Sequence, residues 1–176
     1  MFDPAIRTHQ IRDALCYWLV IPAAVIASGK AIDILLGLPD FSSGPLRMVL
    51  TGALFPAGLI LIFLSMKDLS DGGGTPNPRR PPKKLVTARS YSLCRHPMFL
   101  GYDLCALAVV LWFRSPGMLL ISFPVFLLLQ ILFLRKEEKI LRGKFRQHYT
   151  DYAARTPFLL PLPRRMQFWP RQDAKK

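Results

Sequence analysis

Long apolar stretches, separated by short polar segments, dominate the sequence of this chain of 176 residues. Four of them are long and almost free of charge: residues 14–29, 48–66, 97–113 and 115–134. Only the third contains a charged residue, Asp103, and the first runs on toward Leu38. Because a helix needs about 17 to 25 mostly apolar residues to cross roughly 30 Å of hydrocarbon, the pattern predicts an all-α membrane protein with about four transmembrane helices.

The alternative is a soluble bundle of four buried helices. Apolar residues make up 51% of the chain. A chain of this size that buried four helices apolar on every side would retain too little polar surface. Composition therefore favours the membrane.

Basic residues gather at the same ends of the predicted spans. Of the 24 Lys and Arg residues, all but Lys30, Arg47 and Arg114 precede the first span, lie between the second and third, or follow the fourth. Cytoplasmic connections collect Lys and Arg, so we expect a multi-pass protein with both termini in the cytoplasm. The net charge of +13 then comes mainly from these cytoplasmic segments, which would lie against an anionic lipid surface. No recognisable nucleic-acid module surrounds these residues, so no nucleic-acid partner is expected.

The chain divides into three predicted parts: an N-terminal transmembrane hairpin (residues 1–69), a core (residues 70–163) and a basic tail (residues 164–176). Small residues near Ala27 leave cleavage of a signal peptide open, although an uncleaved first span is favoured. Neither the three Cys nor the three His show metal-binding spacing, so no metal site is predicted. The oligomeric state is left open.

The core contains a loop, a hairpin and a further helix. Residues 70–84 (SDGGGTPNPRRPPKK) are too rich in Gly and Pro for a regular helix or central strand. Only RSPG (residues 114–117) separates the third and fourth spans, and a Pro-Gly turn makes these spans a tight hairpin whose open ends meet on the cytoplasmic face.

Beyond Glu138, a basic interfacial amphipathic helix is expected to run to about Thr156 and to end before PFLLPLP. Its apolar face is formed by Leu141, Phe145, Tyr149 and Tyr152. Such a helix either roofs a site at the end of the hairpin or serves only as a membrane anchor.

Two charged motifs meet at the open end of the predicted hairpin. They are SYSLCRHPMFLG (residues 90–101) and RKEEKIL (residues 135–141). Pro97 suits a first helical turn, where unsatisfied N–H groups, reinforced by Arg95 and His96, suit a carboxylate or phosphate. Glu137 and Glu138 suit a cation or a sugar diol, unless they only balance neighbouring basic residues on a solvated helix face.

These motifs resemble a known family. KKLVTARSYSLCRHPMFLGY, followed by EEKILRGKFRQHYTDY and a proline-rich end, is similar to the isoprenylcysteine carboxyl methyltransferase and phospholipid methyltransferase superfamily of integral membrane enzymes. The resemblance covers roughly residues 72–163 and rests on the combination of an RHP motif with a Glu-Glu pair after the next span. It implies a methyltransferase-like core that uses S-adenosylmethionine on the cytoplasmic face. The methyl group would pass directly to an oxygen or nitrogen of a lipid-borne or lipophilic substrate.

The resemblance also implies which residues contact the cofactor. They are Lys83, Lys84, Leu85, Val86, Tyr91, Arg95, His96, Pro97, Met98, Phe99, Gly101, Glu137 and Glu138. Three positions depart from the family's pattern: Phe99 replaces Tyr, Arg146 replaces Gly, and Phe133 stands where carboxyl methyltransferases of prenylated proteins have Arg.

No catalytic residue follows from these motifs, and two candidates remain. Asp103 is one, because a charge inside a span faces protein or a water-filled cavity and is often functional; the other interpretation is a charge paired within the bundle. Arg135 is the second, as a substitute for the missing substrate-contacting Arg.

Two other functions stay open. Membrane sterol reductases carry a similar RHP motif and bind NADPH, but they generally lack the Glu-Glu pair. A non-catalytic lipid-binding or scaffold protein could retain a decayed site. Binding of S-adenosylmethionine or of NADPH to the purified protein separates these functions.

Overall fold

The structure is a computed structural model that describes residues 19–42, 44–73 and 84–161. Within these ranges every regular element is helical: α2 (Ile21–Leu36), α3 (Pro45–Asp71), α4 (Ser90–Leu93), α5 (Pro97–Phe113), the π-helical turn η2 (Met118–Ser122), α6 (Phe123–Phe145) and α7 (Gln147–Arg155). The all-α prediction is confirmed for this part of the chain. The predictions for the start of the first span, for Lys83 and for the basic tail lie outside the described residues.

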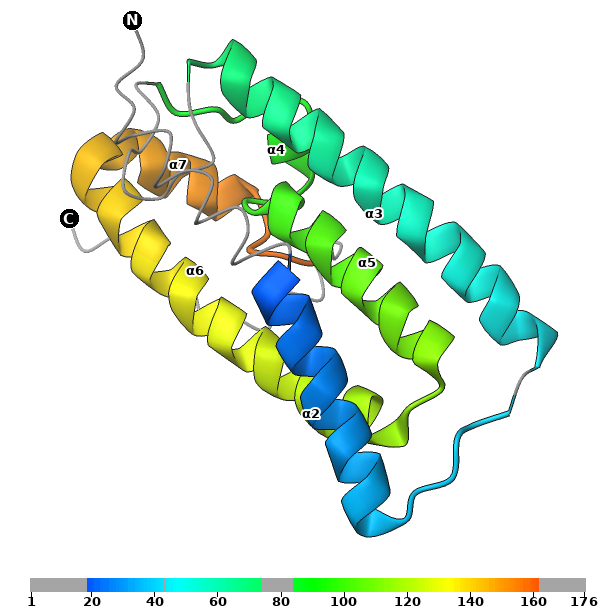
Figure 1. Ribbon diagram of the computed structural model, residues 1–176. Helices are drawn as coiled ribbons and strands as arrows, with labels where there is room; N and C mark the ends of the chain where they lie inside the picture. Colours follow the sequence, from blue (N-terminus) through cyan, green and yellow to red (C-terminus); the bar gives the residue numbers. More distant parts are fainter. Residues whose placement is uncertain (1–18, 43, 74–83, 162–176) are drawn as a thin grey trace, which may run out of the picture.

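The four long helices run alternately in opposite directions, and α7 lies across one end of them (Figure 1). We call the end at which α5 begins the motif end, and the end that holds residues 114–117 the turn end. α3 and α5 pack side by side. A Cβ on Gly58 would lie 2.5 Å from the carbonyl oxygen of Gly101, so these glycines allow the close approach of helices that small residues provide in membranes.

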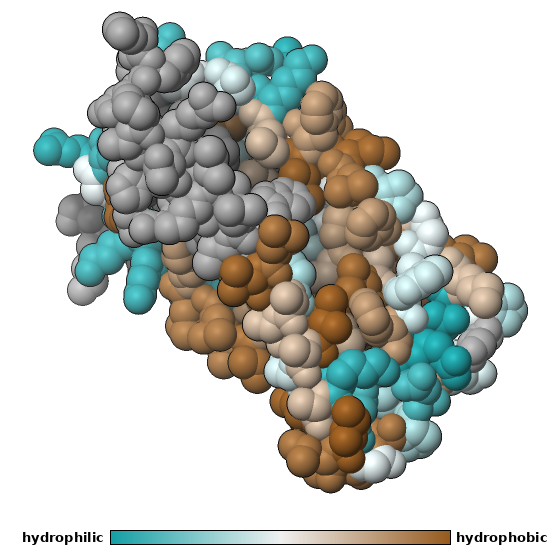
Figure 2. All heavy atoms as spheres, viewed as in Figure 1, coloured by the Kyte–Doolittle hydropathy of each residue, from teal (hydrophilic) through white to brown (hydrophobic). Residues whose placement is uncertain are grey.

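Two helices are long and apolar enough to cross a membrane: α3 and the continuous helix Met118–Phe145 formed by η2 and α6. α5 is apolar but shorter, with 17 residues. Large apolar side chains face outward on α3, where Phe63 is 68% exposed. Figure 2 shows hydrophobic residues over much of the side of the bundle and hydrophilic residues near its ends. These features indicate a membrane protein, while the number of four spans stays a prediction.

The predicted hairpin is present, because residues 114–117 connect α5 directly to the helix that continues through η2 into α6. Arg114 ends α5 in the left-handed conformation, with φ of 56°. Ser115 caps the next helix, since its Oγ accepts a hydrogen bond from the backbone N–H of Met118 (3.0 Å). Pro116 follows at the first-turn position that suits proline.

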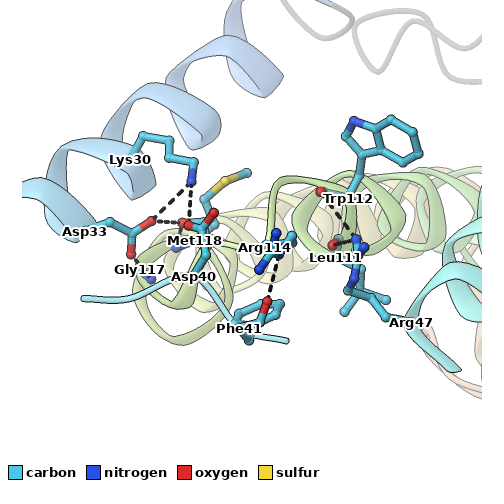
Figure 3. A network of polar contacts seen from close by, with 11 residues as sticks. Lys30, Asp33, Asp40, Phe41, Arg47, Leu111, Trp112, Arg114, Gly117 and Met118 are labelled. Carbon is cyan, nitrogen blue, oxygen red and sulfur yellow. Dashed lines mark hydrogen bonds and ion pairs between the residues drawn. The ribbon is translucent and has the colours of Figure 1, made fainter. Parts of the chain in front are cut away.

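Asp33 of α2 is buried against this turn (Figure 3). Its Oδ1 accepts a hydrogen bond from the backbone N–H of Gly117 (2.7 Å), and its Oδ2 accepts one from the hydroxyl of Ser115. The carboxylate therefore lies at the positive start of a helix, where negative charge is stabilising. Gly117 is needed for this contact, because a Cβ there would lie 2.6 Å from the carbonyl oxygen of Gly29.

The three basic residues outside the predicted cytoplasmic groups all have partners at the turn end (Figure 3). Lys30 pairs with Asp40 (3.2 Å), Arg47 donates to the carbonyl oxygen of Leu111 (2.9 Å), and Arg114 donates to that of Phe41 (2.7 Å). These three charges therefore have structural partners. This agrees with their lying outside the groups of basic residues that predict the orientation in the membrane.

α6 is longer than the sequence analysis predicts. The prediction that a separate helix begins beyond Glu138 is wrong, because α6 continues without a break to Phe145. Residues 135–145 are mostly strong helix formers, so nothing interrupts the helix there. The break comes at Arg146, whose φ of 47° and ψ of −120° favour glycine. α7 follows directly and ends before PFLLPLP, as predicted; its place at the membrane interface stays a prediction.

Candidate functional site

The RHP motif and the acidic pair meet at the motif end of the bundle. Pro97 begins α5 and His96 precedes it as the cap residue, while α6 brings Glu138 opposite. Arg95 Nη1 lies 2.6 Å from Glu138 Oε1, and His96 Nε2 lies 3.5 Å from the same oxygen. His96 and Glu138 are buried and Arg95 is half-buried. The hairpin thus brings the two motifs together as the sequence analysis expected.

The polar atoms of this cluster are buried but poorly paired. Five of them have no partner with hydrogen-bond geometry among the described residues: Arg95 Nε, His96 Nε2, Glu137 Oε2, Glu138 Oε1 and Tyr149 Oη. Glu138 Oε1 has an ion-pair contact with Arg95, but not the angles of a hydrogen bond. A buried polar atom without a partner costs roughly 1–3 kcal/mol, so the cluster is suited to a polar ligand that completes these bonds.

Two tyrosines of α7 belong to this end of the protein, where the sequence pattern left open whether their helix covers a site or only anchors the chain in the membrane. Tyr149 and Tyr152 are buried in the protein. Burial, with the negative charge of Glu138, raises the pKa of Tyr149 well above its usual range, so its hydroxyl stays protonated and can donate. The Tyr152 hydroxyl donates to the carbonyl oxygen of Tyr91 (2.7 Å) and ties α7 to α4. Helical spacing was the only signal for these residues, and it could not reveal which surface they face.

Two aromatic rings lie beside the cluster, further along the hairpin. The ring centroid of Phe99 is 6.3 Å from that of His96 and 6.1 Å from that of Phe133. Phe99 and Phe133 are two of the positions that depart from the family's pattern, and the structure shows that they contact each other. Phe99 and Phe133 therefore lie together on the bundle side of the cluster and form an apolar wall there.

Asp103 lies deeper in the bundle, one turn beyond Phe99 on α5. Both of its carboxylate oxygens accept from Nε2 of Gln130 at 2.9 Å, and both residues are buried. Gln130 precedes Glu138 on α6 by just over two turns, or about 12 Å along the axis. Asp103 is thus paired inside the bundle, away from the cluster. Sequence reasoning missed Gln130, because an amide in an apolar stretch carries no sign of its partner.

The loop residues of the predicted cofactor site lie against α7. Lys84 and Leu85 line an open pocket of about 620 Å³ together with Phe145, His148, Asp151, Tyr152 and Arg155. Val86 contacts the end of α3, since a Cβ on Gly72 would lie 2.3 Å from its Cγ2. Among the described residues, neither the RHP motif nor the acidic pair lines this pocket.

A buried carboxylate anchors the segment between this loop and the RHP motif. Asp68 Oδ2, at the end of α3, accepts hydrogen bonds from the backbone N–H (3.0 Å) and hydroxyl (2.6 Å) of Ser90. Arg89 Nη1 lies 3.3 Å from the other carboxylate oxygen. The role of Asp68 could not be predicted from the sequence, because its partners are distant along the chain.

The remaining predicted residues have varied surroundings. Gly101 lies at the α3–α5 contact, where Gly58 approaches it. Met98 is half-buried, and Arg135 is exposed on α6. The geometry gives Gly101 a clear role in helix packing, while a direct role for Met98 or Arg135 stays a prediction.

Comparison with known proteins identifies the family. The sequence profile described as phospholipid methyltransferase matches residues 46–148, a range that includes α5, α6, the RHP motif and the acidic pair. No curated protein and no solved structure matches the chain. The matched range covers more than half of the sequence and confirms the resemblance in the motifs. The chain therefore belongs to the phospholipid methyltransferase family.

Proposed function

We propose that this protein is a membrane enzyme that binds S-adenosylmethionine and transfers its methyl group to a lipid-borne substrate. Membership of a methyltransferase family supports the reaction class. The single observation that carries the cofactor assignment is the group of buried, poorly paired polar atoms around Glu138. These atoms include both donors and acceptors, and a zwitterionic ligand needs both.

The residues of the cluster fit the polar groups of S-adenosylmethionine. Arg95 and the free N–H groups at the start of α5 suit its carboxylate. Glu137 and Glu138 suit its ammonium group or its ribose diol. When bound, S-adenosylmethionine supplies an electrophilic methyl group, which a lipid oxygen or nitrogen accepts while the sulfur keeps the electrons of the broken bond.

The protein contributes alignment and exclusion of water, which are the main requirements of such a transfer. Tyr149 supplies a neutral hydroxyl next to Glu138, because its raised pKa keeps the proton in place. Phe99 and Phe133 form an apolar wall on the bundle side of the cluster. Loop residues Lys84, Leu85 and Val86 remain proposed further contacts.

The apolar nature of the wall formed by Phe99 and Phe133 helps to identify the methyl acceptor. A carboxylate nucleophile needs no base, whereas an ammonium group must first lose a proton, which a glutamate of the cluster could accept. Phe133 stands where the carboxyl methyltransferases of prenylated proteins have Arg, so the wall has no cation there for a substrate carboxylate. This favours a lipid amine as the methyl acceptor.

We infer that the motif end faces the cytoplasm. The basic residues cluster at this end of the spans, and cytoplasmic connections collect such residues. Both termini would then be cytoplasmic, and a lipid substrate would reach the cluster sideways from the bilayer.

Calorimetry with the purified full-length protein in detergent tests the cofactor. We expect S-adenosylmethionine to bind with a dissociation constant of about 1 μM to 1 mM, the ordinary range for enzyme ligands, and NADPH to give no binding. Binding of NADPH instead would favour a sterol-reductase-like enzyme. Binding of neither by a folded protein would contradict the proposal and favour a scaffold.

Transfer of a labelled methyl group then tests the substrate. Vesicles that contain phosphatidylethanolamine offer an amine, and a prenylcysteine analogue offers a carboxylate. Mild base releases labelled methanol from a methyl ester but leaves an N-methyl group in place. We expect label in the base-stable lipid product.

A further inference from the structure

The segment that follows α7 returns to the RHP motif. The backbone N–H of Arg95 donates a hydrogen bond to the carbonyl oxygen of Pro157 (2.9 Å). Thr156, which is extended at the end of α7, is buried. This part of the chain is therefore fixed against the residue that precedes His96.

The side chain of Phe158 contacts both basic residues of the motif. The guanidinium carbon of Arg95 lies 5.3 Å from the ring centroid of Phe158, within the range of a cation–π interaction. The ring of His96 lies 5.1 Å away in an edge-on arrangement, which aromatic pairs prefer. One aromatic ring thus contacts the two side chains that face Glu138.

Glu138 supplies one constraint on the orientation of these side chains. It contacts Arg95 at 2.6 Å and His96 at 3.5 Å, but Glu138 Oε1 makes no bond of hydrogen-bond geometry. A hydrogen bond weakens as its angle departs from linear, so these contacts define distance better than orientation. The contacts of Phe158 come from a different element and supply a second constraint on the same two side chains.

We propose that Phe158 is a positioning residue: its ring holds Arg95 and His96 in the orientation in which they face Glu138 and the bound ligand. The inference rests on the proposed function in taking S-adenosylmethionine as that ligand. The ring face attracts the guanidinium and meets the imidazole edge-on, which an aliphatic side chain of similar volume does not do. Aromatic character at residue 158 is therefore the feature that matters.

The test compares variants of the full-length protein in detergent by calorimetry. Phe158→Leu removes the ring and keeps an apolar side chain, Phe158→Tyr keeps the ring, and Leu160→Ala truncates a neighbour that is 56% exposed. We expect Phe158→Leu to bind S-adenosylmethionine about tenfold more weakly. The other two variants should stay within about twofold of the wild type. If Phe158→Leu fails to fold, Phe158→Met takes its place.

A double-mutant cycle separates positioning from general destabilisation. Because Phe158 acts partly through Arg95, Phe158→Leu should cause a smaller loss of affinity in an Arg95→Met background than in the wild type. Full addition of the two losses would overturn the proposal. Wild-type affinity in Phe158→Leu, or equal weakening by the Leu and Tyr variants, would do the same.

A second measurement needs no ligand. In protein labelled with ¹³C-histidine, the His96 imidazole signal is identified by its absence in His96→Asn. Phe158→Leu should shift this signal, because it removes the adjacent ring, and Phe158→Tyr should leave it nearly in place. Failure of the wild type to bind S-adenosylmethionine would refute the proposed function only. An unchanged His96 signal in folded Phe158→Leu would refute the role of Phe158.

Discussion

The carboxylates of Asp33 and Glu138 lie at opposite ends of the bundle and are both buried, yet their surroundings differ. Asp33 accepts hydrogen bonds from the N–H of Gly117 and from the hydroxyl of Ser115, both part of one turn. Glu138 has a cation, Arg95, at 2.6 Å, but its Oε1 lacks a well-formed hydrogen bond. The protein itself satisfies the hydrogen bonds of the Asp33 carboxylate, but it does not satisfy those of Glu138.

The same contrast extends to the groups around these two carboxylates. Seven buried side-chain atoms in the described ranges lack a hydrogen-bond partner. Five belong to the Glu138 cluster, whereas Arg47 Nε lies at the turn end and Thr51 Oγ1 lies one turn further along α3. Burial of a charge therefore does not by itself distinguish a binding site from a structural contact. The extent to which its hydrogen bonds are satisfied does.

The largest expected effect is on binding at the motif end. Glu138→Gln keeps the shape of the side chain and removes its charge. We expect the affinity for S-adenosylmethionine to fall about a hundredfold, equivalent to roughly 3 kcal/mol, the upper range for hydrogen bonds to charged groups. The free energy of unfolding should also fall, because Arg95 loses the charge of its ion-pair partner at 2.6 Å, so affinities are compared between folded samples. Calorimetry and unfolding in mixed micelles measure the two quantities, and retained affinity would exclude Glu138 from the site.

At the turn end, a substitution should change stability but not affinity. Asp33→Ala removes the acceptor of two hydrogen bonds and leaves the Gly117 N–H buried without a partner. We expect the free energy of unfolding to fall by about 2 kcal/mol, with the affinity for S-adenosylmethionine unchanged. Asp40→Ala is the matched control, because its ion pair with Lys30 is more exposed and such pairs contribute about 0–1 kcal/mol. Lost affinity in folded Asp33→Ala would show that the two ends are not independent.

A smaller effect concerns the backbone at the motif end. Arg146 adopts φ of 47° and ψ of −120°, a conformation that glycine adopts readily and other residues adopt only at an energetic cost. Arg146→Gly should therefore raise the free energy of unfolding by about 1 kcal/mol, whereas Arg146→Ala should give no such gain. Equal stability of the Gly and Ala variants would indicate that the backbone there is not strained. The resemblance leads us to expect Gly at this position, which agrees with the backbone conformation that Arg146 adopts here.

The sequence predicted the parts of the fold that depend on local pattern. The apolar stretch of residues 97–113 coincides with α5, because Pro97 favours its start and the RSPG turn follows its end. From that turn alone, the meeting of Arg95 with Glu138 could be inferred, since a tight hairpin places its open ends together. The charge pattern alone predicted an anion site beside a cation site. The resemblance added the expectation that S-adenosylmethionine occupies both.

Features that depend on pairing between distant segments could not be predicted. The sequence shows Asp33 and Gln130 only as polar residues in apolar surroundings, and their partners appear once α2 and α5 are packed. Tyr149 fits a membrane-facing stripe as well as a buried one, because periodicity defines a face and not what covers it. The end of α6 was misjudged for a similar reason, since a charged sequence with good helix propensity gives no sign of where a membrane-spanning helix leaves the bilayer.

The π-helical turn η2 has a consequence for how this protein tolerates change. The helix that contains it is anchored at one end by Ser115 and Gly117, and at the other end it presents Glu138 to Arg95. Each residue of an α-helix advances it by about 100° and 1.5 Å, so loss of one residue from η2 would rotate Glu138 away while the turn end kept its contacts. Substitutions in this stretch leave the angle between the anchors intact, but insertions and deletions do not. The number of residues in Met118–Ser122 thus determines the direction in which Glu138 points. Insertions and deletions in this stretch should therefore be tolerated far less well than substitutions.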